Sequence, residues 1–302
     1  MTGLVIRSLV EDEASTVFTS LPDPGLVGRP LLGRPYATRA EGGEYRPEWT
    51  WVALRDGTVV ARAALWGGPH DDEPVVLDWF DFAPGERKAG VELLRTMPHR
   101  EFELVLPTGW RDDPAVLTAA EDRIDAAREA SYRPLVERFR YVWTPACGLP
   151  ERPGRLVFRP EPDDEVILDI LRRIQHNSLD AHERALVDSD GVDAAARDEL
   201  AFFHWMPSPR DWWRVAGTPQ GDTVGLQIPG RNPNGPVVGF IGVVPDQRGN
   251  GYAYDLLAEC THHLVTEGAQ EIAAATDLGN TPMAAHFARA GYPVVQHRFC
   301  MS

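Results

Sequence analysis

The stretch from 236 to 260, PVVGFIGVVPDQRGNGYAYDLLAEC, constrains the fold more than any other part of the chain. An apolar run is followed by a turn that contains Gly249 and Gly251, and apolar residues then recur at helical spacing. We therefore predict a strand at 236–244, a glycine-rich turn and a helix at 250–266. The first amides of a helix have no partner within the helix, and its dipole adds partial positive charge there. The turn is thus predicted to bind an anionic group.

The spacing within this turn narrows the class of anion. Neither a G-x-G-x-x-G dinucleotide motif nor a G-x-x-x-x-G-K-[ST] loop is present. The pattern is Arg248-x-x-Gly251-x-Ala253, which resembles the pyrophosphate-binding signature of the GCN5-related N-acetyltransferases (GNAT), [RQ]-x-x-G-x-[GA]. The resemblance covers 210–302 well and 155–210 loosely.

A second match follows about thirty residues later. Asn280 is followed by Phe287 and then by Gly291 and Tyr292, where the family reads roughly N-x-x-A-x-x-L-Y-x-x-x-G-F. The resemblance implies that acetyl-CoA is a co-substrate, that strand-end amides hold its pantetheine and polarise the thioester carbonyl, and that the turn holds its pyrophosphate. The residues implied to bind it are Val243, Val244, Arg248, Gly249, Asn250, Gly251, Tyr252, Ala253, Asn280 and Phe287.

The sequence departs from the family pattern at the positions of the general acid and the general base. Phe287 stands where the family often has a tyrosine that protonates the leaving thiolate, so Tyr252, Tyr254, His286 or water would have to replace it. The fourth strand, 236–244, also lacks the glutamate that the family often places there.

The remaining candidates for the general base are Asp277, His204 and the acids of the 176–190 segment, namely Asp180, Glu183, Asp188 and Asp190. Asp277 follows the predicted fifth strand, beside the expected acyl site, but it is equally suited to cap a helix or turn. His204 has the alternative role of a partly buried core histidine. An amine that arrives neutral needs no base at all.

Three motifs recur in register along the chain. LVIR at 4–7 matches LVFR at 156–159, and PGERKAG at 84–90 matches PDQRGNG at 245–251. Ala130-Ser131-Tyr132 likewise matches Ala290-Gly291-Tyr292. We therefore predict a duplication.

The duplication predicts two domains of unequal competence. We place a degenerate GNAT-like domain at 1–145, a linker rich in proline and glycine at 146–154, and the catalytic domain at 155–302. The first copy has Lys88 and Glu92 where the second has Gly249 and Ala253. A carboxylate in the first helical turn repels pyrophosphate, so this copy is expected not to bind CoA.

The expected fold class is α+β with a mixed sheet. The resemblance implies that each domain contains a central, mostly antiparallel sheet with splayed fourth and fifth strands, flanked by helices. Locally, the alternating runs at 49–55 and 58–66 around Asp56-Gly57 predict a hairpin. One or two helices are expected between about 164 and 204.

Net charge and cysteine content limit which ligands and metals the chain is expected to bind. The net charge of −15 disfavours nucleic acid and anionic membranes and favours a cationic small molecule, although it also serves solubility. Three cysteines lack metal-ligand spacing, and the His70-Asp71-Asp72-Glu73 run reads as a solvated loop, so no metal is expected. Without a leader-like start or a long apolar run, the chain is expected in the cytoplasm, as a monomer or homodimer.

These features predict an acetyl-CoA-dependent N-acetyltransferase that acts on a primary amine of a small molecule by direct attack in a ternary complex. Two alternatives remain open at this point. One is acyl-CoA decarboxylation or thioester hydrolysis on the same fold, and the other is a non-catalytic acyl-CoA sensor.

Overall fold

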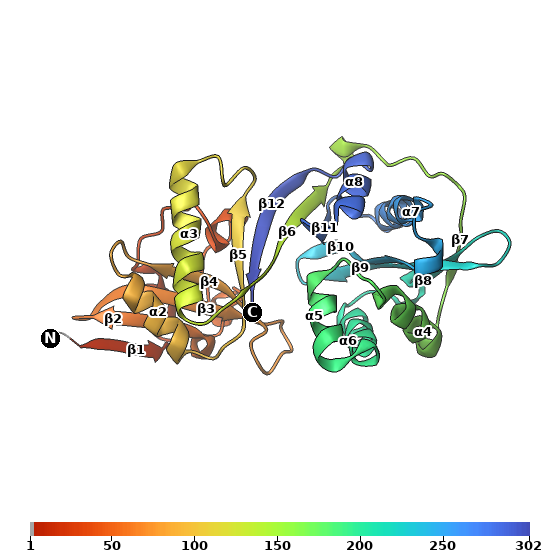
Figure 1. Cartoon of the computed structure of the whole chain (residues 1–302). Helices are drawn as coiled ribbons and strands as arrows, with labels where there is room; N and C mark the ends of the chain where they lie inside the picture. Colours follow the sequence, from red (N-terminus) through yellow and green to blue (C-terminus); the bar gives the residue numbers. More distant parts are fainter. Residues whose placement is uncertain (1–2) are drawn as a thin grey trace. The chain divides into compact units, whose positions relative to one another are not determined.

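The computed structural model describes residues 3–302, which form two compact units (Figure 1). The first unit contains the chain up to Glu137 together with Gln296–Ser302, and the second contains Arg138–Val295. The expected α+β class with a mixed sheet flanked by helices is confirmed in both. The division differs from one placed at a linker around 146–154, which lies inside the second unit, because two strands are exchanged along the chain.

The exchange involves the last strand of each sequence half. β6 (Pro134–Trp143) pairs antiparallel with β11 (Ile272–Asp277) of the second unit, with Ile272 opposite Trp143. β12 (Val294–Met301) pairs antiparallel with β5 (Glu101–Pro107) of the first unit, with Met301 opposite Phe102. Each sheet is therefore completed by a strand from the other half of the sequence.

The first unit has the strand order β1-β2-β3-β4-β5-β12. Its further elements are β1 (Leu4–Ser8), α1 (Ala14–Thr19), η1 (Arg29–Leu32), η2 (Arg39–Glu41), η3 (Pro47–Trp49), β2 (Thr50–Arg55), β3 (Thr58–Trp66), β4 (Val76–Phe82), α2 (Arg87–Thr96) and α3 (Pro114–Glu129). Asp56 and Gly57 have φ values of 52° and 78°, which is the backbone that a two-residue hairpin requires. The predicted hairpin is thus confirmed as β2 and β3.

Alternate residues of β3 and β4 contribute to two hydrophobic cores, one on each face of the sheet. Ala63, Leu65 and Phe80 face α2 and α3, whereas Ala64 and Trp79 face α1 and its neighbouring loops. This alternation follows from the two-residue period of a strand. The sheet of the first unit is therefore packed on both faces.

The second unit has the strand order β6-β11-β10-β9-β8-β7. Its further elements are η4 (Pro145–Cys147), β7 (Val157–Pro160), α4 (Asp164–Gln175), α5 (Ala181–Asp190), α6 (Val192–Trp205), η5 (Arg210–Trp212), β8 (Arg214–Gly217), β9 (Thr223–Asn232), β10 (Gly235–Val243), η6 (Pro245–Gln247), α7 (Tyr252–Thr266) and α8 (Thr281–Arg289). Three helices, rather than one or two, thus fill 164–205. Helices α4, α5 and α6 lie on one side of the central strands, and α7 and α8 lie on the other (Figure 1).

The fourth and fifth strands of the second unit diverge. In the described residues, the parallel pairing of β10 with β11 is confined to Val237 and Ala273. On its other edge, β10 stays paired with β9 as far as Val243, with a bulge at Gly239 between Val238 and Phe240. The expected splay is therefore present, and it opens the sheet beside the glycine-rich turn.

The matched helix ends also share one backbone conformation. Ser131 and Gly291 both follow a helix with positive φ, 81° and 79°. Each is followed by a tyrosine whose amide donates to a carbonyl five residues earlier: Tyr132 to Ala127 and Tyr292 to Phe287, both at 3.0 Å. This helix-ending motif recurs at both copies of the repeat.

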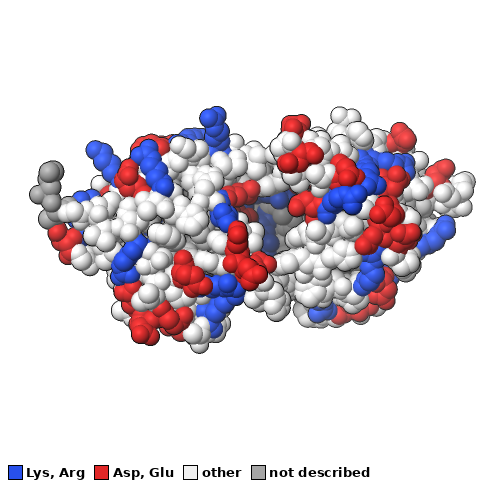
Figure 2. Space-filling view, turned by 90° about the horizontal axis from the view of Figure 1, so that it is seen from below, with Lys and Arg blue, Asp and Glu red and all other residues white. Residues whose placement is uncertain are grey.

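The surface charge is distributed rather than gathered on the face shown in Figure 2. Acidic and basic side chains are interspersed there over both units. The net charge of −15 is therefore not concentrated in one patch of that face. In the part of the chain that the structure describes, no helix is both long and apolar enough to cross a membrane.

Candidate acyl-transfer site

Two adjoining cavities lie in the second unit, and all their lining residues belong to it. The turn-side cavity, of about 640 Å³, is lined by the glycine-rich turn, the end of β10 and the start of α8. The helix-side cavity, of about 540 Å³, is lined by α5, α6, β10 and β11. Both linings include Ile174, Ser178, Ile241, Asn280 and Met283. We call this shared part the junction.

The turn itself has the backbone that the anion prediction requires. Gly249 and Gly251 have φ values of 83° and 74°, in the left-handed region that disfavours residues with a Cβ. Gly251 is the N-cap of α7, so the amides of Tyr252 and Ala253 belong to the first turn of that helix. Gly249, Gly251, Tyr252 and Ala253 all line the turn-side cavity. The cavity wall is thus a helix N-terminus with unpaired donors.

An acid in the first turn of α7 is neutralised by an arginine that sequence reasoning missed. Asp255 is buried, and its Oδ1 accepts from Arg155 Nε at 3.0 Å. Arg155 Nη1 also donates to the carbonyl of Asn250 at 3.0 Å. Arg155 thereby compensates the negative charge of Asp255 and brings a half-exposed cation to the turn.

Arg248 holds the turn together through backbone carbonyls. Its guanidinium donates to Val243 O at 3.1 Å and to Ile174 O at 2.6 Å. It also donates to the carbonyls of His176 and Asn177, at 3.0 and 3.1 Å. These last carbonyls lie at and beyond the C-terminus of α4, where a cation is favourable. Arg248 therefore connects α4 to the end of β10.

The two strand-end amides face opposite ways. The amide of the buried Val244 donates to Val224 O at 2.9 Å, toward β9. Successive amides of an antiparallel strand alternate in direction, so the amide of Val243 points toward the side where β11 has diverged. Val243 lines the turn-side cavity, which makes its amide the better placed of the two to meet a thioester carbonyl.

The other residues expected at the cofactor lie in three different settings. Asn280 lines both cavities, and its side chain accepts from Met283 N at 3.3 Å as the N-cap of α8. The Asn250 side chain donates to Gln247 O at 3.2 Å within the turn. Phe287 is buried against Tyr141, with ring centroids 4.3 Å apart, and it lines the helix-side cavity.

Four carboxylates line the helix-side cavity, namely Asp180, Glu183, Asp198 and Glu199. Asp180 is the N-cap of α5 and pairs with Arg138 at 3.1 Å. Glu183 accepts a hydrogen bond from the junction residue Ser178. Burial raises the pKa of Glu183, an effect that the Ser178 bond partly offsets.

Glu199 has the most perturbed carboxyl group of this cavity. Burial, and then repulsion from Glu183, Asp180 and Asp198, raise its pKa to about 8. Sequence reasoning missed Asp198 and Glu199. The available signal was an adjacent acid pair within an amphipathic helix, which a solvated helix face explains equally well.

Gln175 was also missed, and it is the least satisfied polar group of the cavity wall. Its side chain is 3% exposed, and neither Nε2 nor Oε1 has a hydrogen-bond partner in residues 3–302. Leaving a buried amide unpaired costs about 1–3 kcal/mol, and native proteins seldom retain such groups without a reason. Because Gln175 lines the cavity, a ligand group is able to supply the missing bonds.

The two residues first named as catalytic candidates have other partners. Asp277 is 2% exposed, accepts from Ala181 N at 2.7 Å and pairs with Arg138 Nε at 3.1 Å. His204 lies 2.9 Å from Asp164 Oδ2 and packs on Trp213. Among the described residues that line the two cavities, neither is included. Asp277 instead anchors the start of α5, which carries Glu183.

The alternative proton donors differ in whether they line the turn-side cavity. Tyr252 and His286 line the turn-side cavity, whereas Tyr254 is buried under Arg289. Burial, assisted by Arg289, lowers the pKa of His286, so this imidazole is neutral at neutral pH. Tyr252 and His286 thus both reach the cavity, but a neutral imidazole is too weak an acid to protonate a thiolate, so Tyr252 is the remaining candidate donor of the three.

A strand that ends in a left-handed glycine turn, a helix N-terminus at a cavity and a diverging neighbour strand are together the features that the GNAT resemblance predicts for the fold. Residues 180–292 match the model of the Acetyltransferase (GNAT) family. This match lies within the second unit and confirms the resemblance of that domain to the GNAT superfamily, whose members are in general acyltransferases. No match was found among curated proteins.

Solved structures extend the likeness of fold to both units. A GCN5-related N-acetyltransferase from Sphaerobacter thermophilus has 16% identity and a TM-score of 0.56, over 99% of this chain and 94% of that one. A tandem GNAT protein from the clavulanic acid biosynthesis pathway has 16% identity and a TM-score of 0.50, over 99% and 98%. The glucosamine N-acetyltransferase region of a fungal multi-domain GH3 β-N-acetylglucosaminidase has 12% identity and a TM-score of 0.55, over 100% and 38%.

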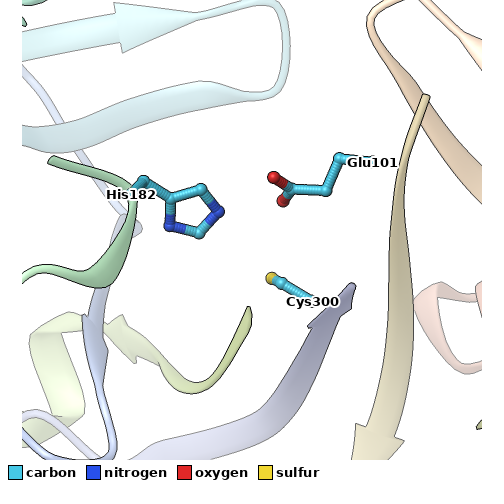
Figure 3. Close-up of side chains that lie close together, drawn as sticks. All are labelled: Glu101, His182 and Cys300. Carbon is cyan, nitrogen blue, oxygen red and sulfur yellow. The ribbon is translucent and has the colours of Figure 1, made fainter. Parts of the chain in front are cut away.

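Figure 3 labels three side chains whose types are able to bind metals. Glu101 and Cys300 belong to adjacent strands β5 and β12 of the first unit, whereas His182 belongs to α5 of the second. Because they come from two units that are described separately, we assign no metal site to them.

Proposed function

We propose that the second unit transfers an acetyl group from acetyl-CoA to a primary amine of a small molecule. The observation that carries the proposal is the meeting of the two cavities at Ser178 and Asn280. One cavity offers an anion-binding turn, and the other offers carboxylates. A ternary complex requires this arrangement, because both substrates must reach one point before the reaction begins.

The turn-side cavity suits the cofactor. In the proposal, amides of Gly249–Ala253 hold the pyrophosphate, with Arg155 adding positive charge at the same turn. The pantetheine lies along the splay between β10 and β11, beside Asn280. The amide of Val243 then stabilises the oxygen of the thioester carbonyl as negative charge develops there.

The helix-side cavity suits the amine. Its carboxylates attract a cation, while Phe240 and Phe287 give it an apolar wall. The neutral amine attacks the thioester carbon, the new C–N bond forms and the C–S bond breaks. One proton leaves the nitrogen, and one proton returns to the thiolate sulfur.

Glu183 is the proposed proton acceptor, acting through Ser178. Ser178 lines both cavities and donates its hydroxyl hydrogen bond to Glu183. A proton from the nitrogen passes to Ser178 Oγ while the hydroxyl proton passes to Glu183. The raised pKa of Glu183 makes this carboxylate a stronger base than an exposed glutamate.

The test is the release of free CoA thiol from acetyl-CoA in the presence of a panel of primary amines. We expect release that depends on the amine and a product of one added acetyl group by mass spectrometry. Release that is independent of any amine would instead indicate thioester hydrolysis. Acetyl-CoA binding without turnover of any acyl donor would indicate a sensor.

A further inference from the structure

We infer that Asp198, Glu199 and Gln175 form a distal cation subsite in the helix-side cavity, and that the acceptor is therefore a diamine. One amino group is acetylated at the junction, and the other stays cationic and is held at the subsite. The inference rests on the proposed function for the reacting amino group. The subsite itself rests on the lining of the cavity.

The position of the subsite follows from which residues line which cavity. The junction is formed at Ser178 and Asn280, where the two cavities meet. Asp198 and Glu199, both on α6, line the helix-side cavity and are not among the described residues that line the other. In the inference, a group bound to these carboxylates lies on the α6 side of the cavity, and the reacting group lies at the junction.

The unpaired amide of Gln175 points to a ligand independently of the acids. It is almost fully buried and lines the same cavity. Its Oε1 has no donor among residues 3–302, and an alkylammonium group carries three N–H donors. A bound cation thus satisfies an acceptor that the protein itself leaves without a partner.

The charge of the cavity exceeds what its own cation neutralises. Arg138 of β6 pairs with Asp180 and with Asp277, at 3.1 Å each. Glu183 of α5 and the α6 pair Asp198 and Glu199 remain as the acids of the wall, and His182 of α5 also lines it. Burial and mutual repulsion favour the protonated form of the carboxyl groups in the cavity wall, as the raised pKa of Glu199 indicates. A ligand with two positive charges replaces these protons.

The helix-side cavity also has apolar lining residues. Leu186, Phe202, Val238, Phe240 and Phe287 line the cavity. Methylene groups bury favourably against such side chains, whereas a hydroxyl-rich sugar would lose hydrogen bonds to water. A linear diamine, which has methylene groups between two amino groups, matches a lining that combines acidic and apolar side chains.

The direct test compares cadaverine with pentylamine, which has the same number of carbons and one amino group fewer. Each is titrated by calorimetry into the full-length protein saturated with CoA, so that no transfer occurs. We expect cadaverine to bind at least about tenfold more tightly. Equal or weaker binding of cadaverine, or no binding, would overturn the subsite.

Variants of the cavity residues show which side chains cause the preference for cadaverine. Glu199→Gln and Gln175→Leu should remove most of the preference for cadaverine and leave pentylamine binding nearly unchanged. Glu271→Gln replaces an exposed glutamate of the same unit outside both cavities, and it should keep the preference. Thermal unfolding of each variant shows whether it is folded. A preference that survives in both folded cavity variants would contradict the assignment.

The two proposals fail differently. If amines release CoA thiol but cadaverine is no better than pentylamine, the subsite is wrong and the acetyl transfer stands. If cadaverine binds selectively while no amine ever releases thiol, the acetyl transfer is wrong and the subsite stands.

Discussion

The fourth strands of the two units, β4 and β10, have the same backbone irregularity but differ in what packs around them. In β4, the bulge between Leu77 and Trp79 falls at Asp78, and in β10 it falls at Gly239. These positions are 161 residues apart, the same offset that relates PGERKAG to PDQRGNG. Residue by residue, the two strands are therefore comparable.

On the side of the splay, the first unit is filled by charge. Arg123 of α3 donates to Phe80 O at 3.3 Å and pairs with Asp81 at 2.6 Å, and Asp81 also pairs with Arg62 at 3.0 Å. All three side chains are buried. The second unit has Met283, Ile241 and Gly242 at the positions matched to Arg123, Phe80 and Asp81, and these three residues line its turn-side cavity.

Next to this charged network the first unit is filled by aromatic rings, and Trp79 Nε1 donates to Asp81 Oδ2 at 2.8 Å. Phe18 stacks on Tyr36 at 4.0 Å, Tyr36 stacks on Tyr45 at 5.1 Å, and Trp79 meets Phe18 edge-on at 5.3 Å. The residue matched to Trp79 is Phe240, which lines the helix-side cavity. Both spaces that the second unit keeps open are thus packed in the first.

Under the proposed function, the first unit keeps the fold of the second but fills the spaces that the second leaves open for ligands. The sequence suggested repulsion by Glu92 as the reason for a silent first unit, yet Glu92 is exposed and pairs with Arg95 at 2.8 Å. The packed splay supplies a second and more direct reason. The proposal that the first unit does not bind CoA now rests on occupied space as well as on charge.

The largest expected effect is on the stability of the first unit. Asp81→Ala leaves Arg62 and Arg123 buried without their shared carboxylate, so the free energy of unfolding should fall by about 3–5 kcal/mol. Denaturant unfolding measures it. Asp56→Ala, at an exposed hairpin position with φ of 52°, is a control that should cost far less. A loss of similar size in both variants would show that the network is not special.

The same network sets a pH dependence. Burial tends to raise the pKa of Asp81, but Arg123 and Arg62 outweigh it and lower that pKa below its usual range. A lowered folded-state pKa contributes stability above the unfolded value of about 3.9, and the contribution is lost as pH falls through the folded value. The wild-type protein should therefore lose this stability only in strong acid, and Asp81→Ala should lack that acid-dependent loss.

Next in size is the effect on the rate of transfer in the second unit. Glu183→Gln keeps a partner for Ser178 but removes the proton acceptor, so kcat should fall by about 100-fold or more. The wild-type rate should rise with pH through a pKa above the ordinary carboxyl value, because the base must be ionised. A Glu183→Gln enzyme with normal kcat and the same pH profile would exclude this role.

A smaller change should make the second unit resemble the first. A Cβ at Gly242 would lie 2.7 Å from Ile174 Cδ1 and 2.7 Å from Phe240 Cε1, so Gly242→Ala crowds the junction. Overpacking of this kind costs about 1–3 kcal/mol, and acetyl-CoA affinity should fall with it. Gly279→Ala, where a Cβ meets no atom within 4 Å, is the matched control. Equal affinities in the two variants would contradict the importance of the open splay.

The smallest effect is expected at the position that the sequence first suggested. Glu92→Ala removes an exposed carboxylate, so stability should change by less than about 0.5 kcal/mol and no second acetyl-CoA site should appear. Calorimetry with acetyl-CoA measures the number of sites. A second site in this variant would mean that charge alone silences the first unit.

The sequence predicted those features that depend on local chemistry. The hairpin at Asp56-Gly57 and the turn at Gly249 and Gly251 follow from backbone preferences and a specific motif, whereas the splayed strands were expected from the family resemblance. The exchange of β6 and β12 depends on which distant strands pair, and no local pattern encodes that choice. Gln175 of α4 and Glu199 of α6 were missed because they line one cavity only after the two helices have packed together, and no local sequence pattern shows that packing.

The central claim is that one unit binds the cofactor and the other does not, and a calorimetric titration of acetyl-CoA tests it most directly. The account predicts one site per chain in the wild-type protein. The site should be lost in Gly251→Glu, which places a carboxylate at the turn, and kept in Gly268→Glu, which changes another left-handed glycine outside both cavities. Two sites per chain, no site, or full binding by Gly251→Glu would contradict it.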